Sequence, residues 1–198
     1  AIENGYVEKL FWDYVKWRRI AESSTWPEPY SNDPTQWLFK GEVTDTTEPL
    51  QVAVARLLGY RWPDQEPDAL DALADEDGIV CIPAVRGEAP AADRLRALLA
   101  RAYGSEWNGN SERALLEQAG AKSRTLEDWL RNEFFEQHFK LFHHRPFIWQ
   151  IWDGTRGGFS ALVNYHKLDR KRLELLTYTY LGDWIRRQEH EKEAGKSG

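Results

Sequence analysis

The sequence contains a single cysteine and no methionine among its 198 residues. One cysteine excludes an intramolecular disulfide and any zinc site built from several cysteines. It lies in the apolar run 79–82, so we expect Cys81 to be a small buried side chain rather than a reactive thiol. Low cysteine usage favours a cytoplasmic location. No apolar run reaches membrane-spanning length and no signal-peptide pattern is present, so we expect no membrane partner.

The chain begins at Ala1 and has no methionine with which an open reading frame would start. We therefore expect a processed chain or a fragment of a larger protein.

Catalytic motifs are missing as well. Walker A, His-Glu-x-x-His and Gly-x-Ser-x-Gly are absent, and no two prolines are adjacent. A carboxylate–lysine cluster of the nuclease kind occurs only near 189–193, in an expected tail. His138 and His143 are five residues apart, which does not place both on one helical face. We therefore expect neither a catalytic residue nor a metal site in this sequence.

The charge is acidic overall and unevenly distributed. The net charge is −6 and the pI is near 5.5, which argues against a free-standing DNA-binding domain. Residues 61–77 hold seven acidic residues and one arginine, whereas 138–172 hold seven basic residues and two aspartates. The basic segment indicates either a phosphate-facing surface or an ordinary solvated face, and charge alone favours the second.

Several helices are predicted from apolar periodicity and end signals. Pro49 opens the segment 49–59, Pro90 opens 90–103, and Ser111 is expected to cap 112–120. Thr125 has capping-box spacing to Asp128 and begins a helix that Pro146 ends. Further helices are expected at 5–22 and from Asp169 to about 188, with a bend at Gly182. Residues 23–35 and 63–78 are expected loops, the latter with one helical turn at 68–73.

The stretch 145–166 predicts two strands joined by a glycine-rich turn. Apolar side chains alternate at Phe147, Trp149 and Ile151, and again from Phe159 to Tyr165. A short apolar segment at 79–82 indicates another strand or a buried extended piece. The fold class is therefore α+β, mostly helical with a small antiparallel hairpin or sheet in the C-terminal third. We expect residues 1–188 to form one module, with 63–78 as an alternative sub-boundary and 189–198 as a charged tail.

The same stretch resembles a known family. RPFIWQIWDGTRGGFSALVNYH (145–166), together with 126–147 and 175–185, is similar to a region C-terminal to the catalytic domain of large DNA adenine-N6 methyltransferases. These belong to single-chain restriction–modification systems and to phage-exclusion systems of the PglX type. Weaker similarity occurs at 32–39, 48–63 and 75–83. The sequence lacks the S-adenosylmethionine loop and the Asn/Asp-Pro-Pro-aromatic motif of that family. The resemblance therefore implies a non-catalytic bacterial module whose parent, not this segment, would use S-adenosylmethionine.

The resemblance implies help in DNA engagement, through the hairpin tip and nearby cations, or in packing the target-recognition region against the methylase domain of the parent. A second hypothesis, which the acidic overall charge favours, is a protein-interaction or scaffolding module that docks on other domains without DNA contact. Both stay open here. The candidate DNA-contact residues are Arg145, Thr155, Arg156, Lys167, Arg170, Lys171 and Arg172. Ten tryptophans spread along the chain indicate core and interface packing first, and we expect Trp149, Trp152, Asn164 and His166 to be structural.

Overall fold

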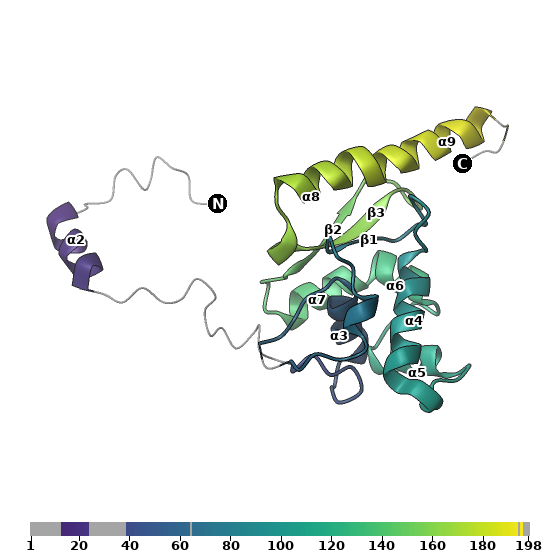
Figure 1. The fold of residues 1–198 in the computed structure, drawn as a ribbon, viewed down its shortest axis with the longest axis horizontal. Helices are drawn as coiled ribbons and strands as arrows, with labels where there is room; N and C mark the ends of the chain where they lie inside the picture. Colours follow the sequence, from purple (N-terminus) through teal and green to yellow (C-terminus); the bar gives the residue numbers. More distant parts are fainter. Residues whose placement is uncertain (1–12, 24–38, 64, 194, 196–198) are drawn as a thin grey trace. The chain divides into compact units, whose positions relative to one another are not determined.

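The computed structural model describes residues 13–23, 39–63, 65–193 and 195 (Figure 1). The chain divides into two compact units, residues 1–33 and 34–198. In the first unit, helix α2 runs from Tyr14 to Ser23. Its first turn is closed by the Asp13 carboxylate, which accepts a hydrogen bond of 3.0 Å from the Lys16 amide. The helix expected at 5–22 is thus confirmed over its described part. Residues 5–12 and nearly all of the loop expected at 23–35 lie outside the described residues.

The second unit contains a layer of five helices. These are α3 (Pro49–Leu57), α4 (Ala91–Tyr103), α5 (Ser111–Gln118), α6 (Leu126–Asn132) and α7 (Phe134–Leu141). Two short 3-10 turns, η2 (Asp71–Leu73) and η3 (Gly104–Glu106), follow α3 and α4 in the chain. Every residue of α3 is buried, with Pro49 at its start, so this helix is the centre of the main apolar core.

Of two helix starts expected from the sequence, one is as predicted and one differs in detail. The Thr125 hydroxyl caps α6 by accepting a hydrogen bond of 3.2 Å from the Asp128 amide, as predicted. Ser111, in contrast, is the first residue of α5, and Asn110 precedes it as the N-cap. The single helix expected from Thr125 is interrupted at Glu133, whose backbone leaves the helical region at φ −129°. The helix also ends at Leu141, before Pro146, because His143 and His144 adopt left-handed φ values of 49° and 67°.

The sheet has three antiparallel strands in the order β1-β3-β2. They are β1 (Ile79–Cys81), β2 (Ile148–Trp152) and β3 (Ser160–Asn164). The hairpin predicted from the sequence is therefore present, and the short apolar segment at 79–82 supplies the third strand. The register sets Ile148 opposite Asn164 and Trp152 opposite Ser160.

Both faces of the sheet are covered, although not equally. One face contributes Val80, Ile148 and Leu162 to the main core beneath the helical layer. The other face contributes Cys81, Ala161 and Val163, among others, to a smaller core with the C-terminal helices. Figure 1 shows these two coverings on opposite sides of the strands.

The C-terminal covering is one nearly continuous helical stretch. After the 3-10 turn η4 (Tyr165–Lys167) come α8 (Arg170–Glu174), a π-helix η5 (Leu175–Leu181) and α9 (Gly182–Glu193). The expected cap is present, since the Asp169 carboxylate accepts a hydrogen bond of 2.8 Å from the Arg172 amide. Gly182, where a bend was expected, is the residue at which the π-helix gives way to α9. That helix continues beyond the expected end at 188.

The architecture is α+β, as the sequence predicts. Within the described part of the chain, no helix is long and apolar enough to cross a membrane. The segment 63–78 contains η2, close to its expected single turn. The division into one module at 1–188 and a charged tail at 189–198 remains a prediction.

Candidate nucleic-acid interface

The seven candidate DNA-contact residues lie at opposite ends of the hairpin. Thr155 and Arg156 occupy the turn between β2 and β3. Arg145 precedes β2, and the remaining four follow β3, at the other end of the same two strands. A five-residue strand spans roughly 15 Å, so the two groups cannot form one compact site.

At the end of the β2–β3 hairpin opposite the turn, most of the candidate cations form hydrogen bonds or ion pairs within the protein. The Lys167 ammonium donates hydrogen bonds to the carbonyl oxygens of Asp75 (2.9 Å) and Glu76 (3.3 Å). Burial lowers its pKa, although the neighbouring Asp75 acts in the opposite direction. Arg170 pairs with Glu174 at 3.0 Å. Lys167 therefore ties the acidic loop to the end of β3.

Arg172 is also engaged by groups of the protein itself. The Arg172 guanidinium pairs with Asp169 at 2.7 Å and approaches Asp77 at 3.9 Å. Lys171 is exposed on α8. Part of the positive segment predicted from the sequence thus lies beside the acidic one, and two of its arginines, Arg170 and Arg172, are paired with carboxylates.

At the other end, the hairpin turn is held by Asp153. Its carboxylate accepts hydrogen bonds from the Thr155 amide (2.9 Å), the Thr155 hydroxyl (2.7 Å) and the Phe159 amide (2.9 Å). Burial acts to raise the pKa of Asp153, but these hydrogen bonds outweigh it and hold the pKa below its usual range. Gly154 and Gly157 take φ values of 81° and 77°, which side chains rarely allow. The turn is therefore a defined structure that presents Arg156.

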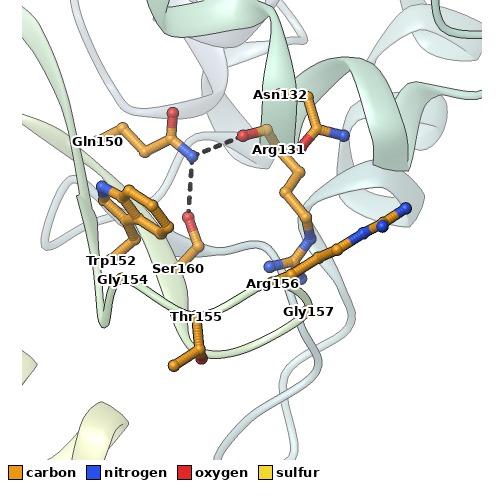
Figure 2. A pocket seen from close by; sticks show the side chains of 9 residues that line it. All are labelled: Arg131, Asn132, Gln150, Trp152, Gly154, Thr155, Arg156, Gly157 and Ser160. Atoms are coloured by element: carbon orange, nitrogen blue, oxygen red, sulfur yellow. Dashed lines mark hydrogen bonds between the residues drawn. The ribbon is translucent and has the colours of Figure 1, made fainter.

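A pocket of about 480 Å³ opens beside this turn (Figure 2). Its lining comes from the end of α6, from β2, from the turn and from the first residue of β3. The lining residues are Arg131, Asn132, Gln150, Trp152, Gly154, Thr155, Arg156, Gly157 and Ser160. None of these described lining residues is acidic, so the pocket carries positive charge in an acidic chain.

The back of the pocket is fixed by hydrogen bonds. The Gln150 amide donates to the backbone oxygen of Arg131 (2.9 Å) and to the Ser160 hydroxyl (3.0 Å), as Figure 2 shows. Arg131 in turn donates from Nη1 to the backbone oxygen of Gly158, at 2.9 Å. These bonds join α6 to the hairpin, and they hold the Arg131 guanidinium in place.

The sides of the pocket are chemically different from one another. In Figure 2, Trp152 lies on one side, and Arg131 and Arg156 lie on the other. The Trp152 side chain is 60% exposed. Among the described residues, Arg156 has no hydrogen-bond or ion-pair partner. A flat aromatic surface facing guanidinium groups is a combination that binds nucleic acid.

The other polar side chains singled out from the sequence have structural positions. Asn164 is buried and donates to the backbone oxygen of Leu58 at 3.2 Å, which agrees with the structural role expected for it. Trp149, 45% exposed, packs at the sheet edge against Phe135. Cys81 is buried, and burial raises the pKa of its thiol to about 12. Within the described residues, no group of three or more His, Cys, Asp or Glu side chains could hold a metal ion.

Two of the pocket's main residues were not expected to be there. Sequence reasoning assigned no role to Arg131, which is placed by the last turn of α6, and assigned Trp152 a structural one. The local pattern offered no signal for Arg131, because the turn that it contacts lies 27 residues further along the chain.

The fold and the pocket define a small α+β module with a positively charged, aromatic-lined site at a hairpin tip. The chain is 28% identical over 93 residues to the adenine-specific methyltransferase PglX of Lacticaseibacillus casei (strain Zhang). The match covers 44% of this chain and 8% of that protein, so the chain corresponds to a small part of its relative. No family model matches the chain. The chain thus contains a region related in sequence to an adenine-specific methyltransferase.

Proposed function

We propose that this chain is a non-catalytic module of a bacterial adenine-specific DNA methyltransferase of a restriction–modification or phage-defence system. In this proposal it works in the cytoplasm and helps the enzyme to engage DNA through the tip of the β2–β3 hairpin. The observation that carries the proposal is the pocket at this tip, where Arg131 and Arg156 face no carboxylate among the lining residues. The similarity to PglX supports the methyltransferase context.

The catalytic steps belong elsewhere in the parent enzyme. A methyltransferase of this kind needs S-adenosylmethionine and an Asn/Asp-Pro-Pro-aromatic motif, and the sequence contains no adjacent prolines. The module would therefore position DNA or the target-recognition domain for a methylase domain that holds the cofactor.

The test is duplex DNA binding by fluorescence anisotropy, at low and at physiological salt. Each phosphate contact contributes about −0.9 to the slope of log affinity against log salt. We expect Arg156→Ala to weaken binding. The slope of log affinity against log salt should become shallower by about 0.9, the value for the loss of one phosphate contact. Arg101→Ala, which removes an exposed cation of α4 outside the pocket, is the matched control and should have little effect.

The two ends of the hairpin can be separated in the same assay. The triple variant Arg170→Ala, Lys171→Ala, Arg172→Ala removes three charges, two of which are paired with carboxylates. We expect it to weaken binding less per charge than Arg156→Ala does. A larger loss from the triple variant would place the DNA surface on α8 instead of at the hairpin tip.

A scaffolding role is the second candidate, because the free edge of the sheet exposes apolar side chains. Trp149 and Ile151 of β2 lie opposite Val163 and Ala161 in the register and are 45% and 36% exposed. Such a surface fits packing against the methylase or target-recognition domains. No DNA binding at low salt would contradict direct contact by this chain and would leave that packing role.

A further inference from the structure

We propose that the hairpin pocket takes a single unpaired nucleotide of DNA, with the base against Trp152 and its phosphate near Arg131 and Arg156. This inference rests on the proposed DNA engagement and names the feature of DNA that the module recognises. In a regular duplex, both flat faces of a paired base are stacked against neighbouring bases. Such a base therefore has no free face with which to stack on Trp152.

The shape of the site favours a nucleotide over a duplex groove. An element that reads a groove projects into it, whereas the tip of this hairpin borders a hollow of about 480 Å³. That volume lies within the range of roughly 300–1,000 Å³ in which pockets enclose small ligands. A splayed-out nucleotide is a ligand of that size.

The exposure of Trp152 supports the stacking partner. Tryptophan buries a large apolar surface in most folds, so an indole left 60% exposed beside an open pocket has apolar surface available for a ligand. Trp149, on the same strand, has Phe135 against its ring at a centroid distance of 5.7 Å. Trp152 lines the pocket and Trp149 does not.

The two arginines suit a phosphate next to that base. Arg131 uses Nη1 for the Gly158 carbonyl, which fixes the guanidinium, and among the described residues this is its one hydrogen bond through the side chain. Arg156 extends from the turn on the same side of the pocket (Figure 2). A guanidinium held in place loses little freedom on binding phosphate and can donate two parallel hydrogen bonds.

The amide of Asn132 lies at the same rim and could meet the edge of the base, because it both donates and accepts hydrogen bonds. Gln150 is less available, since its amide nitrogen is already committed to Arg131 and Ser160. Stacking on Trp152 and the charge of the arginines would therefore contribute more to binding than hydrogen bonds to the base edge. We expect tolerance of all four bases.

The experiment compares two labelled DNA duplexes of the same length by anisotropy, one fully paired and one with a single unpaired nucleotide at its centre. The proteins are the full chain, Trp152→Ala, Trp152→Phe, and Trp149→Ala as the matched tryptophan control. Stacking of one base on an aromatic ring contributes about 5- to 150-fold to affinity. We expect Trp152→Ala to weaken binding of the second duplex by a factor in that range and of the paired duplex by less than about 2-fold.

Trp152→Phe should retain most of the preference, and Trp149→Ala should retain all of it. Equal affinity for the two duplexes, or an equal loss from Trp149→Ala, would overturn the unpaired-nucleotide site while leaving DNA engagement intact. Binding to neither duplex at low salt would instead contradict the proposed function itself. Circular dichroism of each variant separates these results from loss of folding.

Discussion

His138 gives the sharpest test of the core, because a titratable ring lies fully buried at the junction of helix and sheet. Its Nε2 accepts a hydrogen bond of 3.2 Å from the Ile148 amide, which opens β2. The proton of the neutral ring therefore sits on Nδ1 and is donated to Gln51 Oε1, 3.1 Å away on α3. The ring also packs between Phe134 and Phe142.

Burial lowers the pKa of His138 from 6.5 to about 3. The folded-state pKa lies below that of the unfolded chain, so between these values the unfolded chain binds more protons. The stabilising contribution of neutral His138 to the free energy of unfolding is therefore fully present above pH 6.5, and it declines as the pH falls towards 3. At pH 5 the unfolded chain gains about 2 kcal/mol from protonation that the folded chain does not gain, and the free energy of unfolding falls by that amount.

The assay is urea denaturation at pH 7.5 and at pH 5, followed by circular dichroism, for the parent chain and for His138→Gln. Glutamine does not titrate, and its amide can still accept from Ile148 and donate to Gln51. Other ionisable groups, including His166, contribute to both proteins and cancel in the difference. We expect the parent to lose about 2 kcal/mol more than His138→Gln on going from pH 7.5 to pH 5.

The control is His190→Gln, which removes an exposed histidine of α9. It should keep the pH dependence of the parent. A difference between the parent and His138→Gln below about 0.5 kcal/mol would refute the reasoning. That result would mean that the ring is protonated in the folded protein, and the hydrogen bond from Ile148 would then have to be absent.

Two further predictions use the same denaturation assay at neutral pH. Thr125→Ala should lower the free energy of unfolding by about 1 kcal/mol because it removes the cap of α6, whereas Ser105→Ala, at an exposed position in η3, should cost less; equal costs would contradict the assignment of the cap. Arg56→Met should cost about 2 kcal/mol, because buried Arg56 donates charge-assisted hydrogen bonds to Asp71 at 3.0 Å and to Asp68 at 2.5 Å, whose carboxylates are themselves partly exposed. Arg61→Met, which breaks an exposed pair with Asp71 at 2.6 Å, should cost less than about 1 kcal/mol, and a similar cost for both would contradict the argument.

The helices were predictable where their signals are local. Pro49, Pro90 and the caps at Thr125 and Asp169 lie within a turn of the helix that each one starts, so a short window of sequence contains the cause. The interruption at Glu133 was not predictable in this way. Its carboxylate accepts hydrogen bonds from the amides of residues 122 and 123, ten or more positions earlier in the chain.

The candidate site shows the same division. The turn that presents Thr155 and Arg156 is built from Asp153 and glycines within a few residues, and the sequence placed it correctly. Arg131 reaches the pocket through contacts made only in the folded chain. Lys167 remains a candidate phosphate contact, and its hydrogen bond to the Asp75 carbonyl oxygen, 92 residues away in the chain, is invisible in any local pattern.

Net charge is a poor guide to whether this chain can approach DNA, because the six excess negative charges are not spread evenly over the chain. Asp68 and Asp71 pair with Arg56, and Asp75 pairs with Arg94 at 3.0 Å, so these carboxylates project little uncompensated charge. Screening at physiological salt reduces distant exposed charges to small effects beyond about 8 Å. What a DNA phosphate meets at the hairpin tip is therefore set by the groups in the pocket. An acidic chain with a locally basic pocket would bind a fully paired duplex only weakly. Its affinity would rise where the DNA offers an unpaired nucleotide that enters the pocket.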